Sequence, residues 1–387
     1  MQRVRQLRDH LSQSACAQQY RPGAPAILND PPDNWPEWLP FPVHTTVPRF
    51  ALGDTDANAF LEREGYVVFK DVLDVAEVAT ALEKLWAEIE SRSDGVKRGD
   101  PTTWDNGWRT NGVAHDDFLW FVRGCPNVRR IWEQLHGTDD LIVSFDAANV
   151  WKPWGLNPDW RSNAGKMHYD RRNTKGVPDG YIQGFVNLCP TSPETGGNYV
   201  VPRSHLVYDE LEAWKQSLPA EQREEFYKLV AEQRPEIFRE VINAHLEPGD
   251  AFLWTDMTLH QRCPGRGVGP TKPELIRAAV YVCMSPKSKA TPEVLEERRK
   301  AVYCVAAPHP FTRLALIFST SAFVNMSAAR VQWHRRCRKR PHRASPDDRE
   351  LEELAAGGRF EERISNRAAY RSTAAFGGMN ARRCIRV

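Results

Sequence analysis

The stretch Met167-His168-Tyr169-Asp170 places an imidazole and a carboxylate two residues apart. Side chains at positions i and i+2 of an extended segment point to the same side, so His168 and Asp170 can bind one ion together. A third ligand, His260, follows the segment EPGDAFLW (247–254), which predicts a tight turn and a strand that ends just before this histidine. Two histidines and one carboxylate on one face of a metal leave the opposite face open, which is typical of non-haem Fe(II) oxygenases.

The elements predicted after Asp170 distinguish these residues from a chance histidine and aspartate, which more often form an ordinary hydrogen-bonded pair. The sequence predicts an apolar strand at 181–188, a Gly-Gly turn at 196–197 and a second strand at 198–201. His205 follows this second strand. We assign His205 to structure, because it belongs to the turn sequence and not to the metal-binding segment.

A further predicted strand, at 276–282, follows His260 after a loop that is rich in glycine and proline. Arg277 enters this strand from the side of the metal loop. A guanidinium fixed there could bind a carboxylate of a co-substrate through two parallel hydrogen bonds. The alternative for Arg277 is an ion pair at the surface or at a sheet edge.

Together these features resemble the phytanoyl-CoA dioxygenase family of Fe(II)- and 2-oxoglutarate-dependent oxygenases. The resemblance covers about residues 55–290 and implies a mainly β fold with flanking helices, built on a double-stranded β-helix (jelly-roll, cupin-like) core. Arg262 departs from the family pattern, which often has a small or hydroxyl residue at this position. The matching features are His168-x-Asp170, ETGGNYVVPRSH (194–205), EPGDAFLW (247–254), His260 and Arg277.

The resemblance implies roles for individual residues. His168, Asp170 and His260 would be the catalytic iron ligands, and Arg277 would anchor 2-oxoglutarate. Asn149, near the end of a predicted strand at 141–151, is a second candidate to bind 2-oxoglutarate, although an asparagine at a strand end is more often a cap.

The implied reaction uses Fe(II), 2-oxoglutarate and O2. It hydroxylates or otherwise oxidises a small organic substrate and releases succinate and CO2. Two other interpretations stay open. One is a non-catalytic β-barrel binding protein that retains the fold, and the other is a metal-dependent cupin-type enzyme that does not use 2-oxoglutarate.

Composition restricts the partners of this 387-residue chain. Its formal net charge of +2 does not favour nucleic acid or an anionic membrane, so a small-molecule substrate is the expected partner. The most apolar stretch, 314–323, is too short and too polar to span a bilayer. The oligomeric state does not follow from the sequence.

Cysteine usage and the N-terminus bear on location. The eight cysteines include no Cys-x-x-Cys pair, which disfavours a structural zinc site or a redox dithiol. With no secretory signal, we expect an intracellular, cytoplasmic protein. Residues 3–11 (RVRQLRDHL) are similar to an N-terminal peroxisomal targeting signal, with a short amphipathic helix as the alternative.

The pattern along the chain predicts three parts. Residues 1–54 form an extended N-terminal arm, since 21–47 is dense in proline and tryptophan. Residues 55–290 form the oxygenase domain. It contains a helical insertion at about 206–240, which we interpret as a solvated pair of helices, with a lid or an interface as the alternative. Residues 291–387 form a C-terminal tail that we predict to be poorly ordered.

Overall fold

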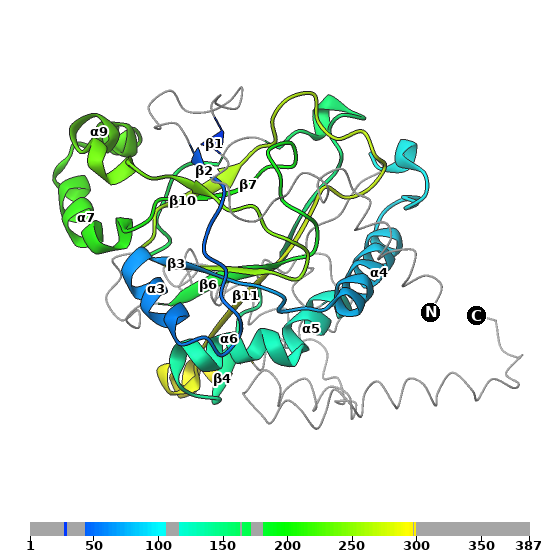
Figure 1. The fold of residues 1–387 in the computed structure, drawn as a ribbon, viewed down its shortest axis with the longest axis horizontal. Helices are drawn as coiled ribbons and strands as arrows, with labels where there is room; N and C mark the ends of the chain where they lie inside the picture. The colour runs from blue at the N-terminus through cyan, green and yellow to red at the C-terminus, as the bar shows by residue number, and fades with distance from the viewer. Residues whose placement is uncertain are drawn as a thin grey trace, which may run out of the picture.

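The computed structural model of the chain describes residues 27–28, 43–105, 116–162, 165–171, 181–296 and 298. The sequence 3–11, most of the predicted arm and most of the predicted tail lie outside these residues. The described part contains two β-sheets with helices on their outer sides (Figure 1). None of its helices has the length and apolar character needed to cross a membrane.

The two sheets are built mainly from antiparallel pairs, with β2 and β8 as the parallel exception. In the larger sheet the strands follow the order β3 (Tyr66–Phe69), β9 (Ala251–Thr255), β6 (Ile182–Asn187), β11 (Arg277–Pro286) and β4 (Leu141–Val143), with β5 (Ala148–Trp151) also paired to β11. In the smaller sheet the order is β1 (Ile27–Leu28), β2 (Val43–His44), β8 (Ile242–Asn243), β7 (Gly197–Val200) and β10 (His260–Cys263).

Two groups of helices flank the sheets, one along the lower and right-hand sides of the view and the other at its left (Figure 1). The first group comprises α3 (Asp56–Glu64), α4 (Val75–Arg92), α5 (Asp117–Gly124) and α6 (Pro126–His136). The second group comprises α7 (Tyr208–Ser217), α8 (Ala220–Arg223) and α9 (Phe226–Gln233). Short 3₁₀ helices complete the described part: η1 (Pro101–Thr103), η3 (Pro158–Trp160), η4 (Ser204–Val207), η5 (Pro235–Phe238) and η6 (Lys287–Lys289). The structure therefore confirms sheets with flanking helices.

Local sequence explains where the longest helix begins. The side chain of Asp74 accepts a hydrogen bond from the backbone N of Glu77 at 2.8 Å, and the side chain of Glu77 accepts one from the backbone N of Asp74 at 2.9 Å. This reciprocal capping satisfies two donors that the first turn of α4 would otherwise leave unpaired. One face of α4 is buried, including Leu85 and Trp86, and packs into the core beside the larger sheet.

Several strands form where the sequence predicts them, and two predictions need correction. The strand predicted at 251–254 is β9, but it does not run up to His260, because residues 256–259 turn and His260 begins the separate strand β10. The strand predicted at 141–151 is divided into β4 and β5. Residues 144–147 belong to neither strand, although the backbone N of Ser144 donates to the carbonyl of Cys283 and the backbone N of Tyr281 donates to the carbonyl of Ala147.

Gly65 brings the end of α3 close to the loop that leads to His260. Its φ of +81° lies in the left-handed region, which glycine adopts without strain. A Cβ atom at this position would lie 2.6 Å from Oγ1 of Thr258. The carbonyl of Gly65 also accepts hydrogen bonds from the backbone N of Thr255 at 3.0 Å and from Oγ1 of Thr258 at 2.7 Å. The loop that leads to His260 is therefore held against the C-terminal end of α3.

Candidate metal centre

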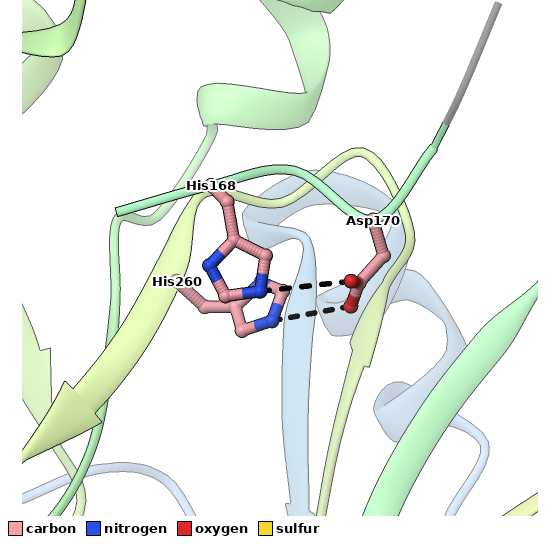
Figure 2. A group of neighbouring side chains, drawn as sticks. All are labelled: His168, Asp170 and His260. Atoms are coloured by element: carbon pink, nitrogen blue, oxygen red, sulfur yellow. Dashed lines mark ion pairs between the residues drawn. The ribbon is translucent and has the colours of Figure 1, made fainter. Parts of the chain in front are cut away.

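Three side chains from two distant segments converge on one point, as Figure 2 shows. Nε2 of His260 lies 3.2 Å from Oδ2 of Asp170, and Nε2 of His168 lies 3.6 Å from Oδ1 of Asp170. One ligand atom from each residue lies within 4.8 Å of the others. Ligand atoms about 2.1 Å from a metal ion and at right angles to one another lie about 3 Å apart. The three residues are therefore placed to hold one metal ion.

Backbone pairing produces this convergence. His168 forms an isolated antiparallel bridge with His260, in which each backbone N donates to the other residue's carbonyl at 3.1 Å. Two residues on, the backbone N of Asp170 donates to the carbonyl of Asp256 at 3.0 Å. The segment is extended along β10 and its approach loop, so His168 and Asp170 project to the same side. This confirms the geometry expected of residues at positions i and i+2.

Both imidazoles are oriented by backbone carbonyls. Nδ1 of His168 lies 2.7 Å from the carbonyl oxygen of Lys166, and Nδ1 of His260 lies 2.9 Å from that of Thr258. A carbonyl can only accept, so each Nδ1 carries a proton, and in the neutral imidazole that metal binding requires each Nε2 presents its lone pair. The two Nε2 atoms and the carboxylate of Asp170 are then three acceptors that face one another. A cation at their centre satisfies all three, so the donor set fits a metal ion.

The charge states that follow from the surroundings suit metal binding. Burial raises the pKa of Asp170, but the imidazoles of His260 and His168, when protonated, and a hydrogen bond from Gln183 hold this pKa well below its ordinary value. Partial burial lowers the pKa of the His168 imidazole by removing water from it, and the neighbouring His260 lowers this pKa further. At neutral pH the carboxylate is ionised and His168 is neutral, as metal ligands must be.

Gln183 is a contact of the site that the sequence did not reveal. It lies on β6, and its side-chain Nε2 donates to Oδ2 of Asp170. The available signal was a polar residue in an apolar strand, on the same side as Phe185. Phe185 packs against Trp254 with 6.0 Å between ring centroids, and Trp254 packs against His260 at 5.1 Å. The inner side of the larger sheet therefore contacts the metal-binding residues directly.

A Gln183→Leu variant tests the contribution of this hydrogen bond. Loss of the donor frees Oδ2 of Asp170 to rotate away from the two imidazoles, and we expect roughly 10-fold weaker binding of Mn(II). The measurement is equilibrium dialysis of the purified protein against Mn(II), with a Gln216→Leu variant as control, because Gln216 donates to Glu212 on the exposed side of α7. Equal Mn(II) affinity in Gln183→Leu and the wild-type protein would show that the hydrogen bond from Gln183 does not orient Asp170 for metal binding.

Arg277 lies on β11 and is 2% exposed. Its Nη2 donates to Oδ1 of Asn198 at 3.2 Å, and its guanidinium lies over the rings of Trp151 and Phe185, 4.8 and 5.1 Å from their centroids. Within the described ranges no carboxylate forms an ion pair with it, and its buried Nε has no acceptor. Burial lowers its pKa, yet guanidinium stays charged in proteins. Within the part of the chain that the structure describes, Arg277 is therefore a buried cation without an ion-pair partner, and not an ion pair at the surface or a sheet edge.

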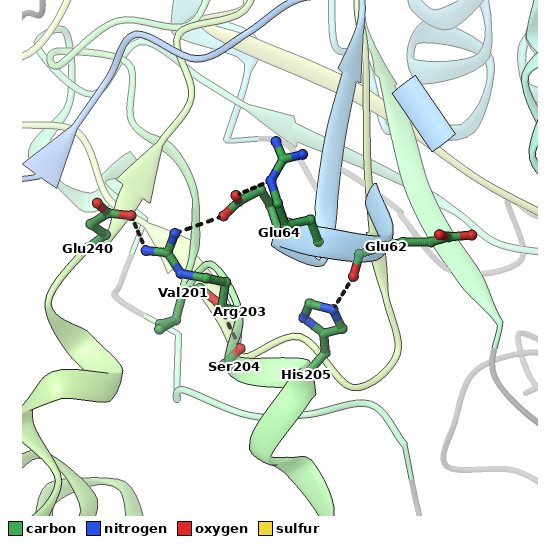
Figure 3. A network of polar contacts seen from close by, with 8 residues as sticks. Glu62, Glu64, Val201, Arg203, Ser204, His205 and Glu240 are labelled. Atoms are coloured by element: carbon green, nitrogen blue, oxygen red, sulfur yellow. Dashed lines mark hydrogen bonds and ion pairs between the residues drawn. The ribbon is translucent and has the colours of Figure 1, made fainter. Parts of the chain in front are cut away.

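The other two candidates lie at different places. Asn149 lies opposite Ala279 on β11, and its Nδ2 donates to the hydroxyl of Tyr281 at 3.4 Å. Asn149 shares this sheet with Arg277, but its side-chain hydrogen bond goes to Tyr281 and not to Arg277 or to the three candidate ligands. His205 lies apart from the site, with Nε2 2.9 Å from the carbonyl of Glu62 in α3 (Figure 3). The structure thus agrees with a structural role for His205.

Arg171 follows the metal-binding segment and forms an ion pair, with Nε 3.0 Å from Oδ2 of the fully buried Asp256. Burial raises the pKa of Asp256, and the hydrogen bond and charge of Arg171 oppose this rise. The pair joins the residue after Asp170 to the loop before His260. It was not apparent in the sequence, because neither residue lies in a periodic element.

Comparison with known proteins found several similar chains. An Aspergillus versicolor protein, Ava biosynthesis cluster protein O, is 28% identical over 282 residues, which cover 65% of this chain and 83% of that protein. Among solved structures, the non-haem α-ketoglutarate-dependent epimerase SnoN from nogalamycin biosynthesis is 19% identical with a TM-score of 0.40, and the match covers 60% of this chain and 82% of SnoN. EctD from S. alaskensis with 2-oxoglutarate and 5-hydroxyectoine is 16% identical with a TM-score of 0.41, covering 70% and 86%.

The family model for phytanoyl-CoA dioxygenase (PhyH) matches residues 61–263. This match spans just over half of the 387 residues and includes His168, Asp170 and His260. The chain belongs to the phytanoyl-CoA dioxygenase (PhyH) family.

Proposed function

We propose that the protein is an Fe(II)- and 2-oxoglutarate-dependent dioxygenase that hydroxylates or otherwise oxidises a small organic substrate and releases succinate and CO2. His168, Asp170 and His260 hold the iron, and Arg277 binds the far carboxylate of 2-oxoglutarate. The observation that carries the proposal is the convergence of two Nε2 atoms and one carboxylate within 4.8 Å. Membership of a family of dioxygenases supports it.

The residues of the chain bind and orient, and bound Fe(II) with 2-oxoglutarate and O2 supplies the oxidative chemistry. The two histidines and Asp170 occupy one side of the ion and leave the other side for 2-oxoglutarate and O2. Nε of Arg277 has no acceptor among the described residues. Together with a neighbouring Nη group it can donate two parallel hydrogen bonds to a carboxylate. Ring contacts of Phe185 and Trp254 lead from this guanidinium to His260, and we propose that these apolar rings form one wall of the site and help to keep water from the reacting groups.

We further propose that the two sheets together make the double-stranded β-helix core of the domain. From β8 onward, successive strands alternate between the sheets, with β8 and β10 in the smaller one and β9 and β11 in the larger one. This alternation places His260 on one sheet and Arg277 on the other. Asn149 is a second contact for 2-oxoglutarate in this proposal, because it lies two positions from Trp151, over which the Arg277 guanidinium lies.

The substrate-binding group that we propose is the hydroxyl of Tyr181. This residue immediately precedes β6 and, two positions before Gln183, lies on the same side of an extended chain. Its hydroxyl is buried and has no hydrogen-bond partner in the described part of the molecule. A buried hydroxyl normally has a partner, so a polar group on a bound small molecule is a suitable one.

Uncoupled turnover tests the proposal without knowledge of the substrate. Protein purified anaerobically and supplied with Fe(II), 2-oxoglutarate and O2 is expected to form succinate, and omission of any one of the three should stop it. Succinate is measured by mass spectrometry, and 2-oxoglutarate binding is followed separately by absorption of the anaerobic Fe(II) protein. Fe(II) binding with no 2-oxoglutarate binding would favour the cupin-type alternative. Binding of neither would favour a non-catalytic β-barrel.

A further inference from the structure

The segment that carries His168 and Asp170 has a second side. Met167 and Tyr169 alternate with the two metal-binding residues and enter a separate apolar core on the outer side of the smaller sheet. This core also contains Leu259, which precedes His260. The remaining members include Leu211, Phe226, Val230 and Phe238. They come from the helical insertion predicted at about 206–240, which the structure delimits as 204–238 because η4 begins at Ser204.

Tyrosines of the helical insertion contact the residues on either side of Asp170. Tyr169 lies between Tyr208 and Tyr227, with ring centroids 5.0 and 6.0 Å away. The hydroxyl of Tyr208 donates to the carbonyl of Arg171 at 3.3 Å, directly after Asp170. These contacts act on main-chain and side-chain atoms within one residue of Asp170.

Ser204 joins both ligand-bearing segments. Its carbonyl accepts a hydrogen bond from the hydroxyl of Tyr169 at 3.3 Å, and its Oγ accepts one from the backbone N of Leu259 at 2.8 Å. The same Oγ donates to the carbonyl of Val201 at 2.7 Å, as Figure 3 shows, so the hydroxyl is fixed in direction. Ser204 is 1% exposed, so water does not replace these bonds. One residue thus contacts the neighbour of His168 and Asp170 as well as the neighbour of His260.

We propose that the helical insertion is a clamp that holds the two ligand-bearing segments in register, with Ser204 and Tyr208 as its positioning residues. Its effect on metal affinity rests on the proposed metal centre, whereas its effect on the segments exists without metal. The alternation of an extended chain is the physical basis. Each proposed ligand points to one side of its segment, and the neighbouring side chain points to the other side, where the helical insertion contacts it. The insertion is therefore part of the metal centre's framework and not a solvated attachment.

The test compares Ser204→Ala and Tyr208→Phe with Ser217→Ala. Ser217 also lies in the insertion, and its Oγ donates to the carbonyl of Trp214 at 2.7 Å, away from both ligand-bearing segments. Hydrogen–deuterium exchange of the metal-free proteins reports on the amides of 167–171 and 258–260, and equilibrium dialysis measures Mn(II) affinity. We expect exchange of these peptides to rise by roughly 10-fold and Mn(II) affinity to fall by roughly 10-fold in the first two variants, and neither in the third.

Three results are distinguishable. Unchanged exchange at 167–171 and 258–260 in both variants would overturn the inference. An equal rise in exchange in all the described strands would also overturn it, because such a rise reports a general loss of stability. A local rise in exchange together with no Mn(II) binding by the wild-type protein would support the clamp and refute the proposed metal centre. If Ser204→Ala does not fold, Tyr208→Phe gives the same decision, because its ring remains and the bond to Arg171 is lost.

Discussion

An Asp170→Asn variant is expected to bind Fe(II) more than about 100-fold more weakly than the wild-type protein and to form no succinate from 2-oxoglutarate. Loss of a residue that merely orients a metal ligand costs 10–100-fold in affinity, and Asp170 is proposed as a ligand itself. The change keeps the shape of the side chain but removes its charge. An amide also places a donor where the Nε2 atoms of His168 and His260 present lone pairs, so the histidines are satisfied without a metal.

The measurements are anaerobic dialysis against Fe(II) and the rise in melting temperature that the metal causes. A ligand present at 100 times its Kd stabilises the folded state by about 2.7 kcal/mol, and this increment should disappear in the variant. His136→Asn is the control, because Nε2 of this histidine lies 3.0 Å from the carbonyl of Met284, outside both the site and the helical insertion. Wild-type affinity in Asp170→Asn, or an equal loss in His136→Asn, would refute the assignment of the three ligands.

The relation of His168 to Asp170 was predictable because it depends on local geometry: the alternation of an extended chain fixes it in any fold. The position of His260 beside them comes from its backbone bridge to His168, which joins residues far apart in the chain. The detailed path was not predictable. The strand before His260 was expected to continue to this residue, yet β9 ends at Thr255 and a turn lies between them.

The contacts that support the ligands could not be predicted, because each joins residues far apart in the chain. Gln183 reaches Asp170 from the other sheet, and Asn198 reaches Arg277 in the same way. Such pairs depend on how the sheets pack, which no local pattern encodes. The length and order of the strands indicated the sheets, but not which polar side chains would meet between them.

The helical insertion illustrates the same limit for an amphipathic segment. Its apolar residues predicted helices with one buried face, and the structure contains α7, α8 and α9 within this segment. Periodicity shows that a face is buried but not what it is buried against. The sequence interpretation of a solvated pair of helices missed that Leu211 and Phe226 share a core with Tyr169 and Leu259. The partner of that face is the reverse side of the metal-binding segment.

Replacement of Arg277 is the second change with a large expected effect. An Arg277→Met variant should need roughly 100-fold more 2-oxoglutarate for half-saturation, because loss of a buried charged partner costs about 3 kcal/mol. Methionine retains much of the side-chain length over Trp151 and Phe185, so the packing is conserved while the charge is lost. Fe(II) affinity should stay near that of the wild-type protein, since the side chain of Arg277 contacts Asn198, Trp151 and Phe185 and not the three proposed ligands.

Arg277→Lys separates charge from geometry. Lysine restores a cation but cannot form two parallel bonds, so its half-saturating 2-oxoglutarate concentration should lie between those of the wild-type protein and Arg277→Met. Titration of 2-oxoglutarate into the anaerobic Fe(II) protein measures both variants, with Arg203→Met as control, because Arg203 pairs with Glu64 and Glu240 away from the site. If Arg277→Met kept wild-type activity and gave no response to 2-oxoglutarate, this buried cation would have another anion, and the metal centre would belong to a cupin-type enzyme that works without a keto acid.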